Sequence, residues 1–256
     1  MNLLGFQTDI VWEDRKANFG RIEAMLESQE TPGAPSLFVF PELSTCGFTM
    51  NAGAVAEPVA GESESFFSAL AQRYQSSVIA GVARETGQPG QGANEAVCFA
   101  PDGHEIGRYR KRNPFPLANE ADHYPAGDRS VVVQMGDWKV APLICYDLRF
   151  PEPFREAVQL GAELFVVIAS WPVVRVDHWT TLLRARAIEN LAYVVGVNRA
   201  GADPHLAYPG ASIVVGPKGE ILAEAGDSPA ILSATLDRAE LLKWRADFPA
   251  LKGLNP

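Results

Sequence analysis

Cys145 closes an apolar run, Val140-Ala-Pro-Leu-Ile144, and Tyr146-Asp-Leu-Arg-Phe-Pro151 follows at once. The run predicts a buried strand, and Pro151-Glu-Pro153 predicts the first turn of a helix. A thiol on that turn lies at the carboxyl end of a strand, where open α/β sheets bind ligands, and the helix dipole favours thiolate there. Free cysteine is also commonly buried as a small core residue, so this segment alone fits a nucleophile and a structural thiol equally.

A cysteine that attacks a carbonyl needs a base and hydrogen-bond donors for the oxyanion that forms. Histidine is the usual base, but no histidine of this chain stands in a pattern that pairs it with Cys145. The four histidines are His104 in a predicted hairpin, His123 in a loop, His178 beside Trp179 at a helix start, and His205. The base is therefore expected among other residue types.

Three further residues with side chains that could take part in catalysis lie at predicted strand ends or in a loop. Glu42 follows the apolar run Phe38-Val-Phe40, and it fits either a base near Cys145 or a capping carboxylate in a loop. Lys111 belongs to the basic run Tyr109-Arg-Lys-Arg112, which also fits a solvated turn. Glu120 supplies a second carboxylate in a loop. Each signal is weak when it is taken alone.

Composition limits the classes of function. A chain of 256 residues with 47% hydrophobic residues is long enough for one large α/β domain or two small ones. The 22 basic and 31 acidic residues give a net charge of -9, which argues against nucleic acid or an anionic membrane as the main partner. The 3 cysteines include no CxxC pair, so neither a disulfide framework nor a metal clamp is expected.

The amino-terminal segment Met1-Asn-Leu-Leu-Gly-Phe-Gln-Thr8 has no basic start and only a short apolar run. It predicts a first strand rather than a signal peptide. No run of about 18 apolar residues is present to span a bilayer. A soluble, cytoplasmic protein is expected.

Strand and helix patterns alternate along the chain, as in α/β proteins. Strands are predicted at residues 2–8, 37–40, 77–82, 94–100, 104–110, 140–144, 163–169, 192–198, 211–216, 220–224 and 231–235. Helices are predicted at residues 14–28, 63–74, 177–191 and 238–245, with Asp14 as an N-cap, and loops at residues 32–35 and 87–92. The tail after about residue 245 is expected to be extended.

Two predicted hairpins resemble each other, Val97-Cys-Phe-Ala-Pro-Asp-Gly-His-Glu-Ile106 and Ile213-Val-Val-Gly-Pro-Lys-Gly-Glu-Ile221. This similarity indicates a weak internal duplication, with two similar halves that each contain a sheet and covering helices. No long linker separates the halves, so a single domain over residues 1–256 is predicted.

The order of a strand-end glutamate, a Tyr-x-Lys and a strand–cysteine elbow resembles the nitrilase superfamily of carbon–nitrogen hydrolases. The residues that carry it are Phe40-Pro-Glu42, Tyr109-Arg-Lys111 and Cys145-Tyr-Asp-Leu-Arg-Phe-Pro151. Further matches are Arg184-Ala-Arg-Ala-Ile-Glu-Asn190, Gly210-Ala-Ser212 and Val215-Gly-Pro-Lys-Gly-Glu220. The resemblance runs from the first strand to about residue 245.

The resemblance implies an α/β fold with four layers, an α-β-β-α sandwich, and a site formed by Cys145, Glu42 and Lys111. Glu120 matches a second glutamate that many members place beside the nucleophile. Two positions depart from the pattern of many relatives, because Asn113 and Ala211 stand where those relatives have histidine. The departures bear on details of the pocket. The resemblance signals no metal and no organic cofactor, and it favours a homodimer formed through residues 151–160 and 177–191.

The expected chemistry is a proton transfer from the thiol to Glu42, followed by attack of Cys145 on an amide carbonyl. Free cysteine titrates near ~8.5 and free glutamate near ~4.3, a gap of roughly 5–6 kcal/mol against the base. Burial should raise the pKa of Glu42, while Lys111 and the helix start should lower that of Cys145. Lys111 and the backbone N–H of Tyr146 are expected to hold the oxyanion, and ammonia would leave.

Arg149 lies four residues after the cysteine, so its guanidinium could bind a substrate carboxylate or form an ion pair with Asp147 or Glu152. The surrounding motifs, with Ser170-Trp-Pro172, resemble the ω-amidase branch, which acts on 2-oxoglutaramate and 2-oxosuccinamate. Trp171, Arg175 and Tyr146 are further candidates for the pocket. The alternatives are an amidase for deaminated glutathione, an N-carbamoyl amine or an aliphatic amide, a glutaminase that feeds a partner, and an inactive binding protein.

Overall fold

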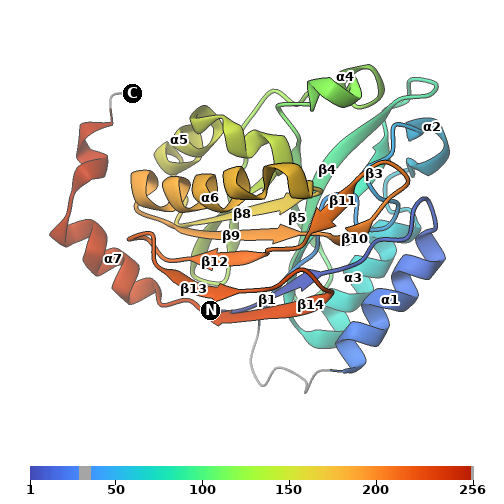
Figure 1. The fold of residues 1–256 in the computed structure, drawn as a ribbon. Helices are drawn as coiled ribbons and strands as arrows, with labels where there is room; N and C mark the ends of the chain where they lie inside the picture. Colours follow the sequence, from blue (N-terminus) through green and yellow to red (C-terminus); the bar gives the residue numbers. More distant parts are fainter. Residues whose placement is uncertain (29–35, 255–256) are drawn as a thin grey trace.

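The computed structural model describes residues 1–28 and 36–254 and contains two six-stranded sheets (Figure 1). The predicted loop at residues 32–35 lies outside the described residues. The first sheet has the order β14-β1-β2-β3-β4-β5. Its strands are β1 (Asn2–Gln7), β2 (Ser36–Val39), β3 (Ser77–Glu85), β4 (Gly92–Phe99), β5 (Glu105–Arg110) and β14 (Ala230–Thr235). Three central strands, β1, β2 and β3, run parallel.

The second sheet has the order β13-β12-β9-β8-β7-β6. Its strands are β6 (Val133–Met135), β7 (Trp138–Ile144), β8 (Leu164–Ala169), β9 (Tyr193–Asn198), β12 (Ile213–Val215) and β13 (Ile221–Glu224). The strands β7, β8 and β9 run parallel, and the wholly apolar sequence of the central strand β8 agrees with a sheet that is buried on both faces. Each sheet contains one of the two similar hairpins, β4–β5 and β12–β13. A small ladder joins β10 (Ala200–Ala202) and β11 (Ala207–Pro209).

Helices cover the outer faces of both sheets (Figure 1). Those on the first sheet are α1 (Arg15–Glu27) and α3 (Glu62–Tyr74), and those on the second are α5 (Pro151–Gln159) and α6 (Val176–Asn190). Three others are α2 (Ala52–Val55), α4 (Glu120–His123) and α7 (Arg238–Asp247). The predicted four-layer α-β-β-α sandwich is therefore confirmed. None of the helices in the described part of the chain is long and apolar enough to cross a membrane.

One apolar core fills the space between the two sheets. Leu37 and Ile79 of the first sheet belong to the same buried cluster as Leu143 and Val166 of the second. The sheets approach so closely that a Cβ on Gly5 of β1 would lie 2.9 Å from Cγ2 of Val197. A second cluster packs the outer face of the first sheet against α1 and α3. Two sheets held this closely give a rigid frame for side chains at their edges.

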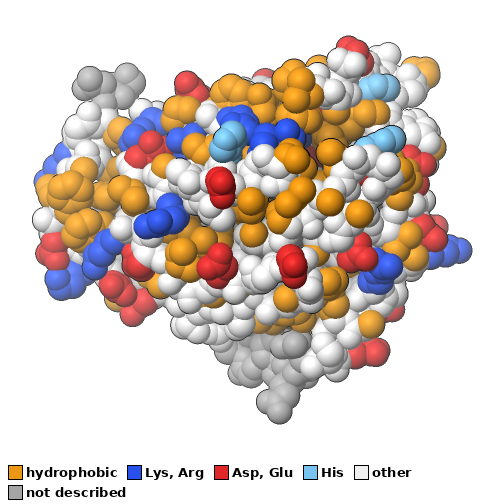
Figure 2. Space-filling model, viewed as in Figure 1, with side chains coloured by type: hydrophobic (Ala, Val, Ile, Leu, Met, Phe, Trp, Pro, Cys, Tyr) orange, Lys and Arg blue, Asp and Glu red, His pale blue; other side chains and the backbone are white. Residues whose placement is uncertain are grey.

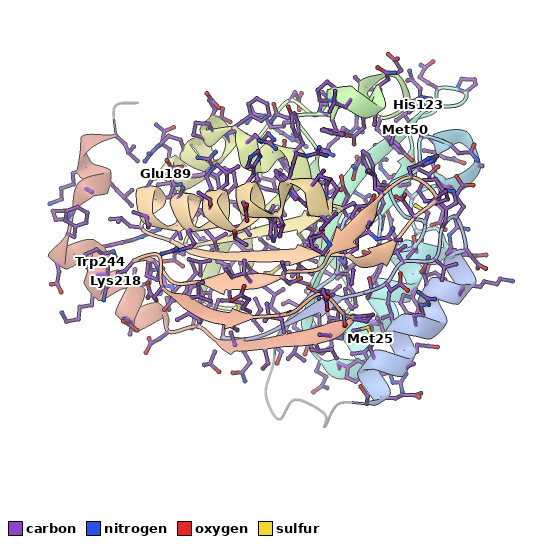
Figure 3. All side chains as sticks on the ribbon, in the orientation of Figure 1. Met25, Met50, His123, Glu189, Lys218 and Trp244 are labelled. Carbon is purple, nitrogen blue, oxygen red and sulfur yellow. The ribbon has the colours of Figure 1, made fainter. Side chains whose placement is uncertain are left out.

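The predicted elements agree with the structure to within about three residues at their ends, and Asp14 caps α1 by accepting from the backbone N–H of Ala17. The expected extended tail is wrong, because α7 continues to Asp247 and a 3₁₀ turn spans Ala250–Gly253. Lys218 lies 5.1 Å from the ring centroid of Trp244, which ties the β12–β13 turn to α7 (Figure 3). This contact keeps α7 near the second sheet.

Candidate active site

Cys145 ends β7 and begins a 3₁₀ turn over Cys145–Arg149, and α5 starts only at Pro151. Arg149 therefore lies in the 3₁₀ turn and not in the helix that follows it. The backbone of Cys145 has a φ of 46°, in the left-handed region that residues with a side chain rarely adopt. Such backbone conformations are often found at functional sites, where the surroundings hold them in place.

The buried carboxylate of Asp147 holds this turn. It accepts hydrogen bonds from the backbone N–H of Ile144 at 3.1 Å and from the hydroxyl of Tyr109 at 2.8 Å. It also accepts from the backbone N–H and the side-chain amide of Asn113, at 2.9 and 2.8 Å. Burial raises the pKa of Asp147 above its usual value, although these donors act to lower it. Asp147 thus connects the cysteine turn to the chain that follows Lys111.

Glu42 comes three residues after the last residue of β2, and its side chain is fully buried. Its Oε1 atom accepts from Nζ of Lys111 at 2.7 Å, and its Oε2 atom accepts from the backbone N–H of Ser170 at 2.9 Å. Gly81 of β3 packs directly behind it, because a Cβ at Gly81 would lie only 2.6 Å from Cα of Glu42. A glycine at this point lets β3 and the Glu42 loop touch.

Lys111 follows β5 and is 2% exposed. Its Nζ atom lies between two carboxylates, 2.7 Å from Glu42 and 2.8 Å from Glu120. Burial alone would lower the pKa of Lys111, but the charges of Glu120, Glu42 and Cys145 outweigh burial and raise the pKa. The lysine is therefore a fixed ammonium ion. The ring of Phe48 lies 5.0 Å from Nζ and shields it on another side.

Glu120 begins α4 and is also fully buried. Its carboxylate accepts from the backbone N–H of Phe115 at 2.6 Å and from Nδ2 of Asn94 at 2.9 Å, in addition to Lys111. The segment between Lys111 and α4 is thereby folded back onto the lysine. The structure thus brings Glu42, Lys111 and Glu120 into one buried cluster beside Cys145.

The thiol of Cys145 is buried, and its pKa is raised well above the usual value. Burial is the largest cause and the negative charge of Glu42 adds to it, while Lys111 and the backbone of Ser170 act in the opposite direction. Lys111 acts to lower the pKa as expected, but burial and Glu42 outweigh it, so the expected lowered pKa of the thiol is wrong. The resting thiol is neutral, so a reaction at its sulfur requires that the proton be removed at the same time.

A pocket opens above Cys145 and contains all the residues predicted from the sequence for substrate binding. Its lining residues are Phe48, Phe115, Cys145, Tyr146, Arg149, Ser170, Trp171, Pro172, Arg175 and Leu206. It encloses about 370 Å³ including its open mouth. A second hollow shares Phe48, Phe115, Arg175 and Leu206 with it and extends to Trp12, Met50, Leu117 and Tyr208.

Arg149 does not form the ion pair with Asp147 or Glu152 that was one alternative. Its guanidinium lies 5.0 Å from the ring centroid of Trp171, and its Nη2 atom lies 3.1 Å from Nδ1 of His178. Arg175 lies 5.3 Å from the ring centroid of Phe115. Within the described residues neither guanidinium forms an ion pair with a carboxylate. Two unpaired cations therefore border the pocket, which favours an anionic ligand.

The roles of three residues of the site were not predicted from the sequence. Asn94 contacts both carboxylates, Asp147 holds the cysteine turn, and Ser170 donates its backbone N–H to Glu42. Asn94 is a polar residue in a predicted strand, which was an available signal, since buried polar groups need partners. No signal in the sequence points to the backbone N–H of Ser170.

Comparison with known proteins gives matches over nearly the whole chain. The family model for carbon–nitrogen hydrolases matches residues 5–246. The omega-amidase YafV of Yersinia enterocolitica is 38% identical over 252 residues, which is 98% of this chain and 95% of the relative. The 2-oxoglutaramate amidase of Bacillus subtilis is 31% identical over 252 residues, which is 97% of this chain and 95% of the relative.

A solved structure of similar fold is XC1258 from Xanthomonas campestris, a CN-hydrolase superfamily protein with an arsenic adduct in its active site. It superimposes with a TM-score of 0.93 at 32% sequence identity, and the match covers 100% of this chain and 97% of that one. Both the sequence and the arrangement of the sheets are therefore shared with these proteins.

Proposed function

The chain belongs to the carbon–nitrogen hydrolase family, and from this premise we propose that it is an ω-amidase. It hydrolyses the terminal amide of a small 2-oxo dicarboxylic acid monoamide, such as 2-oxoglutaramate or 2-oxosuccinamate, and releases ammonia. The observation that carries the proposal is that Arg149 and Arg175, both without a carboxylate partner in the described residues, line the same pocket as Cys145. A substrate with an amide at one end and a carboxylate at the other fits this arrangement.

The first half-reaction forms a thioester. Oε1 of Glu42 already accepts two donors, Lys111 and Asn94, whereas Oε2 accepts one donor and can take a proton. Glu42 removes the proton of the Cys145 thiol, and the sulfur attacks the amide carbon. Lys111 and the backbone N–H of Tyr146 hold the oxyanion. Glu42 then gives its proton to the leaving nitrogen, the C–N bond breaks and ammonia departs.

The second half-reaction regenerates the thiol. Glu42 takes a proton from a water molecule, and the hydroxide adds to the thioester carbon. The C–S bond breaks, the sulfur recovers the proton from Glu42, and the carboxylic acid product leaves and gives its own proton to solvent. Glu120 orients Lys111 through the contacts at 2.8 and 3.1 Å. The side chains supply all the proton transfers that this sequence needs.

A raised thiol pKa is compatible with this role of Cys145. Transfer of the proton to Glu42 creates a thiolate and removes the glutamate charge, so the net charge of the buried cluster stays the same. The repulsion from Glu42 that raises the pKa of the thiol disappears in the same step. Lys111 faces the thiolate as well as the carboxylate, because its charge interacts with both groups. The proton transfer therefore moves charge only a short distance beside a fixed cation.

The test is release of ammonia from 2-oxoglutaramate by the wild-type protein and by Cys145→Ala. We expect turnover that disappears in the variant. Arg149→Met and Arg175→Met should lower kcat/KM for 2-oxoglutaramate by about 10–100-fold, as expected for loss of a charge-assisted contact. They should change turnover of a simple aliphatic amide much less. Arg184→Met, which removes a contact to the backbone of Gly219 outside the pocket, is the matched control. Absence of Cys145-dependent ammonia release would overturn the proposal.

A second candidate substrate is a longer amide such as deaminated glutathione. The hollow that adjoins the pocket favours it, because an acid of five carbons leaves that space unused. The ratio of kcat/KM for the two amides decides between them. If kcat/KM is higher for the longer amide than for 2-oxoglutaramate, the longer amide is the better assignment of the substrate.

We also propose a homodimer in the cytoplasm. Leu160, Val173, Val174 and Ile188, which lie in or next to α5 and α6, are all at least 46% exposed. Figure 2 shows hydrophobic side chains gathered along the upper part of this face, interspersed with Lys and Arg. The three cysteines are free, as expected in a reducing compartment. Sedimentation of the wild type and of Val174→Asp measures the dimer, and a monomeric wild type would contradict it.

A further inference from the structure

The side-chain amide of Asn94 donates hydrogen bonds to both buried carboxylates of the site, Glu42 and Glu120. Asn94 lies in β4, is 1% exposed, and its Nδ2 atom donates to Oε1 of Glu42 at 2.8 Å and to Oε1 of Glu120 at 2.9 Å. The same two oxygen atoms accept from Nζ of Lys111, at 2.7 and 3.1 Å. The amide and the ammonium thus bridge the same pair of oxygens and close a ring of four side chains.

This ring has an electrostatic imbalance that Asn94 compensates. Two carboxylates and one ammonium carry a net charge of -1 in a place where every member is at most 2% exposed. Buried charge is stable only where other groups compensate it. The two N–H groups of Asn94 point at the oxygens on the side where a second cation would otherwise be needed.

The orientation of the Asn94 amide indicates that its N–H groups are what the site requires. Its Oδ1 atom is buried and has no hydrogen-bond partner within residues 1–28 and 36–254. A flipped amide would place Oδ1 against the carboxylate oxygens of Glu42 and Glu120, which repel it. A buried acceptor without a partner is unfavourable. Here the two charge-assisted hydrogen bonds from Nδ2 offset that cost.

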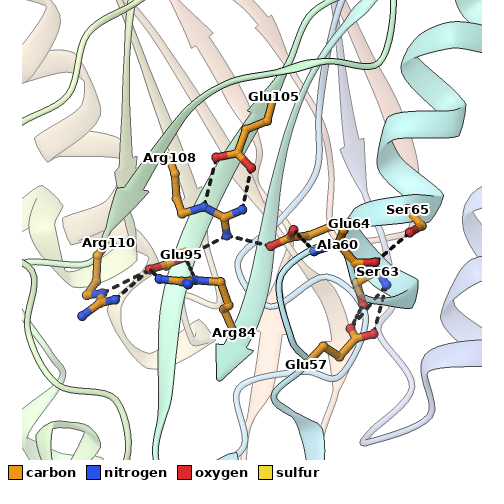
Figure 4. Close-up of polar contacts among 10 residues, drawn as sticks. All are labelled: Glu57, Ala60, Ser63, Glu64, Ser65, Arg84, Glu95, Glu105, Arg108 and Arg110. Atoms are coloured by element: carbon orange, nitrogen blue, oxygen red, sulfur yellow. Dashed lines mark hydrogen bonds and ion pairs between the residues drawn. The ribbon is translucent and has the colours of Figure 1, made fainter. Parts of the chain in front are cut away.

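The backbone at Asn94 is fixed by a hydrogen bond to Lys111 and by the contacts of the next residue, Glu95, on the opposite face of the sheet. The carbonyl of Asn94 accepts from the backbone N–H of Lys111 at 3.0 Å, so the two residues face the site as neighbours. The next residue, Glu95, points to the opposite face because side chains alternate along a strand. There it accepts from Arg84, Arg108 and Arg110 (Figure 4). Movement of Asn94 would therefore disturb both networks.

The two oxygens of Glu42 are not equivalent. Oε1 faces Lys111 and Asn94, whereas Oε2 accepts the N–H of Ser170. The backbone of Ser170 also acts to lower the pKa of the Cys145 thiol, so this backbone lies near the sulfur. Oε2 is therefore the oxygen on the side of the thiol, and Asn94 occupies the remaining lone pair on the far oxygen.

We propose that Asn94 is a positioning residue that holds the carboxyl groups of Glu42 and Glu120 around one ammonium ion and directs the proton of Cys145 to Oε2 of Glu42. The proposal rests on the function proposed above. The titratable groups that face the ring are Glu42, Glu120 and Lys111 themselves, with Cys145 and Tyr124 next to them. Loss of the amide removes two hydrogen bonds to these carboxyl groups, and such hydrogen bonds favour the charged form of a carboxyl group.

Asn94→Leu preserves the size of the side chain and removes both donors. We expect kcat per active site to fall by about 10–100-fold, in the range of general acid–base effects, with KM changed less than about threefold. The acidic limb of the pH profile should move to higher pH. Asn94→Asp has the shape of the native side chain but adds a third carboxylate, and it should lose more activity at pH 8 than the leucine variant.

Asn190→Leu is the matched control. Asn190 is also fully buried, donates to the backbone of Arg186, and has an unpartnered Oδ1, but it lies at the end of α6 away from the ring. It should lower Tm and leave the pH profile unchanged. If both Asn94 variants only lose stability, with kcat per titrated site and the acidic limb unchanged, the proposal is overturned.

A second measurement separates this proposal from the substrate assignment. The rate of alkylation of Cys145 by iodoacetamide, followed against pH, reports removal of the thiol proton without any amide substrate. Asn94→Leu should lower this rate by about 10-fold or more at neutral pH relative to the wild type, as expected for a disabled base. An unchanged alkylation profile would overturn the role of Asn94, whereas failure to hydrolyse 2-oxoglutaramate would overturn only the proposed substrate.

Discussion

The carboxylate of Glu42 accepts the backbone N–H of Ser170 at 2.9 Å across 128 residues of sequence. Glu42 follows β2 of the first sheet and Ser170 follows β8 of the second, so this bond crosses between the sheets. Lys111 and Asn94 come from the first sheet and Cys145 from the second. The cluster therefore exists only when the two sheets are packed together, and residues that fix their strand ends should affect activity as strongly as residues of the pocket.

Asp147 is the clearest case of such a residue. In Asp147→Asn the side chain keeps its size, but an NH₂ group faces donors from Tyr109, Asn113 and Ile144. We expect kcat to fall by more than about 100-fold, because a displacement of about 1 Å at a reacting group has that effect. Ammonia release per folded molecule measures it. Asp102→Asn, in the exposed turn between β4 and β5, is the control, and equal activity of the two variants would contradict the prediction.

Much of the arrangement could be predicted from the sequence because strand ends are marked locally. Apolar runs that stop at Glu42 and Cys145, and a predicted strand that ends just before Lys111, place these residues at sheet edges. The order of the motifs indicated the fold. The partners of Asn94 could not be predicted, since they lie 52 and 26 residues away along the chain. Nothing local marks the 3₁₀ turn between Cys145 and Arg149, because Pro151 marks only the start of the helix.

The raised pKa of the Cys145 thiol is a second property that could not be predicted from the sequence. The neighbours of Cys145 along the chain predicted a lowered pKa, but burial dominates in the structure. Burial depends on Glu42, Ser170 and the facing sheet, none of which is close in sequence. The alternation of side chains along β4 was predictable in principle, and it would have placed Asn94 on one face and Glu95 on the other.

Glu95 should stabilise the protein through its three arginine partners. Burial acts to raise the pKa of Glu95, but hydrogen bonds from Arg84 and Arg108 outweigh it and lower the pKa. A lowered pKa means that the stabilisation is present above the pKa of the unfolded state and is lost as pH falls through the folded value. Glu95→Gln should reduce the free energy of unfolding by about 3 kcal/mol at pH 7, as for a broken buried ion pair.

Urea unfolding at several pH values measures this effect. The difference between wild type and Glu95→Gln should shrink as pH falls below about 4.3, where glutamate of the unfolded state becomes protonated. Glu105→Gln is the matched control, since Glu105 contacts only Arg108 of this network and is partly exposed. A difference that is constant from pH 3 to pH 7 would show that the charge of Glu95 is not the cause.

Cys46 should make the protein less stable at alkaline pH. Burial raises the pKa of its thiol to about 12, whereas an unfolded thiol titrates near 9.0. The unfolded state therefore loses its proton first, and the folded state loses up to about 4 kcal/mol of stability as pH rises from 9 to 12. The free energy of unfolding of Cys46→Ala should fall less steeply over this range. Parallel curves for variant and wild type would contradict the assignment.

Lys111→Met should have the largest effect on turnover. The variant keeps a side chain of similar length but leaves Glu42 and Glu120 without the ammonium ion that they share at 2.7 and 2.8 Å. One of the two carboxyls must then take up a proton, and the oxyanion loses a charged donor, so kcat should fall by about 1,000-fold or more. Removal of the cation should also slow alkylation of Cys145, because the thiolate loses its nearest positive charge. Lys16→Met on the exposed side of α1 is the control, and a Lys111→Met enzyme within tenfold of wild type would rule out the lysine as an oxyanion donor.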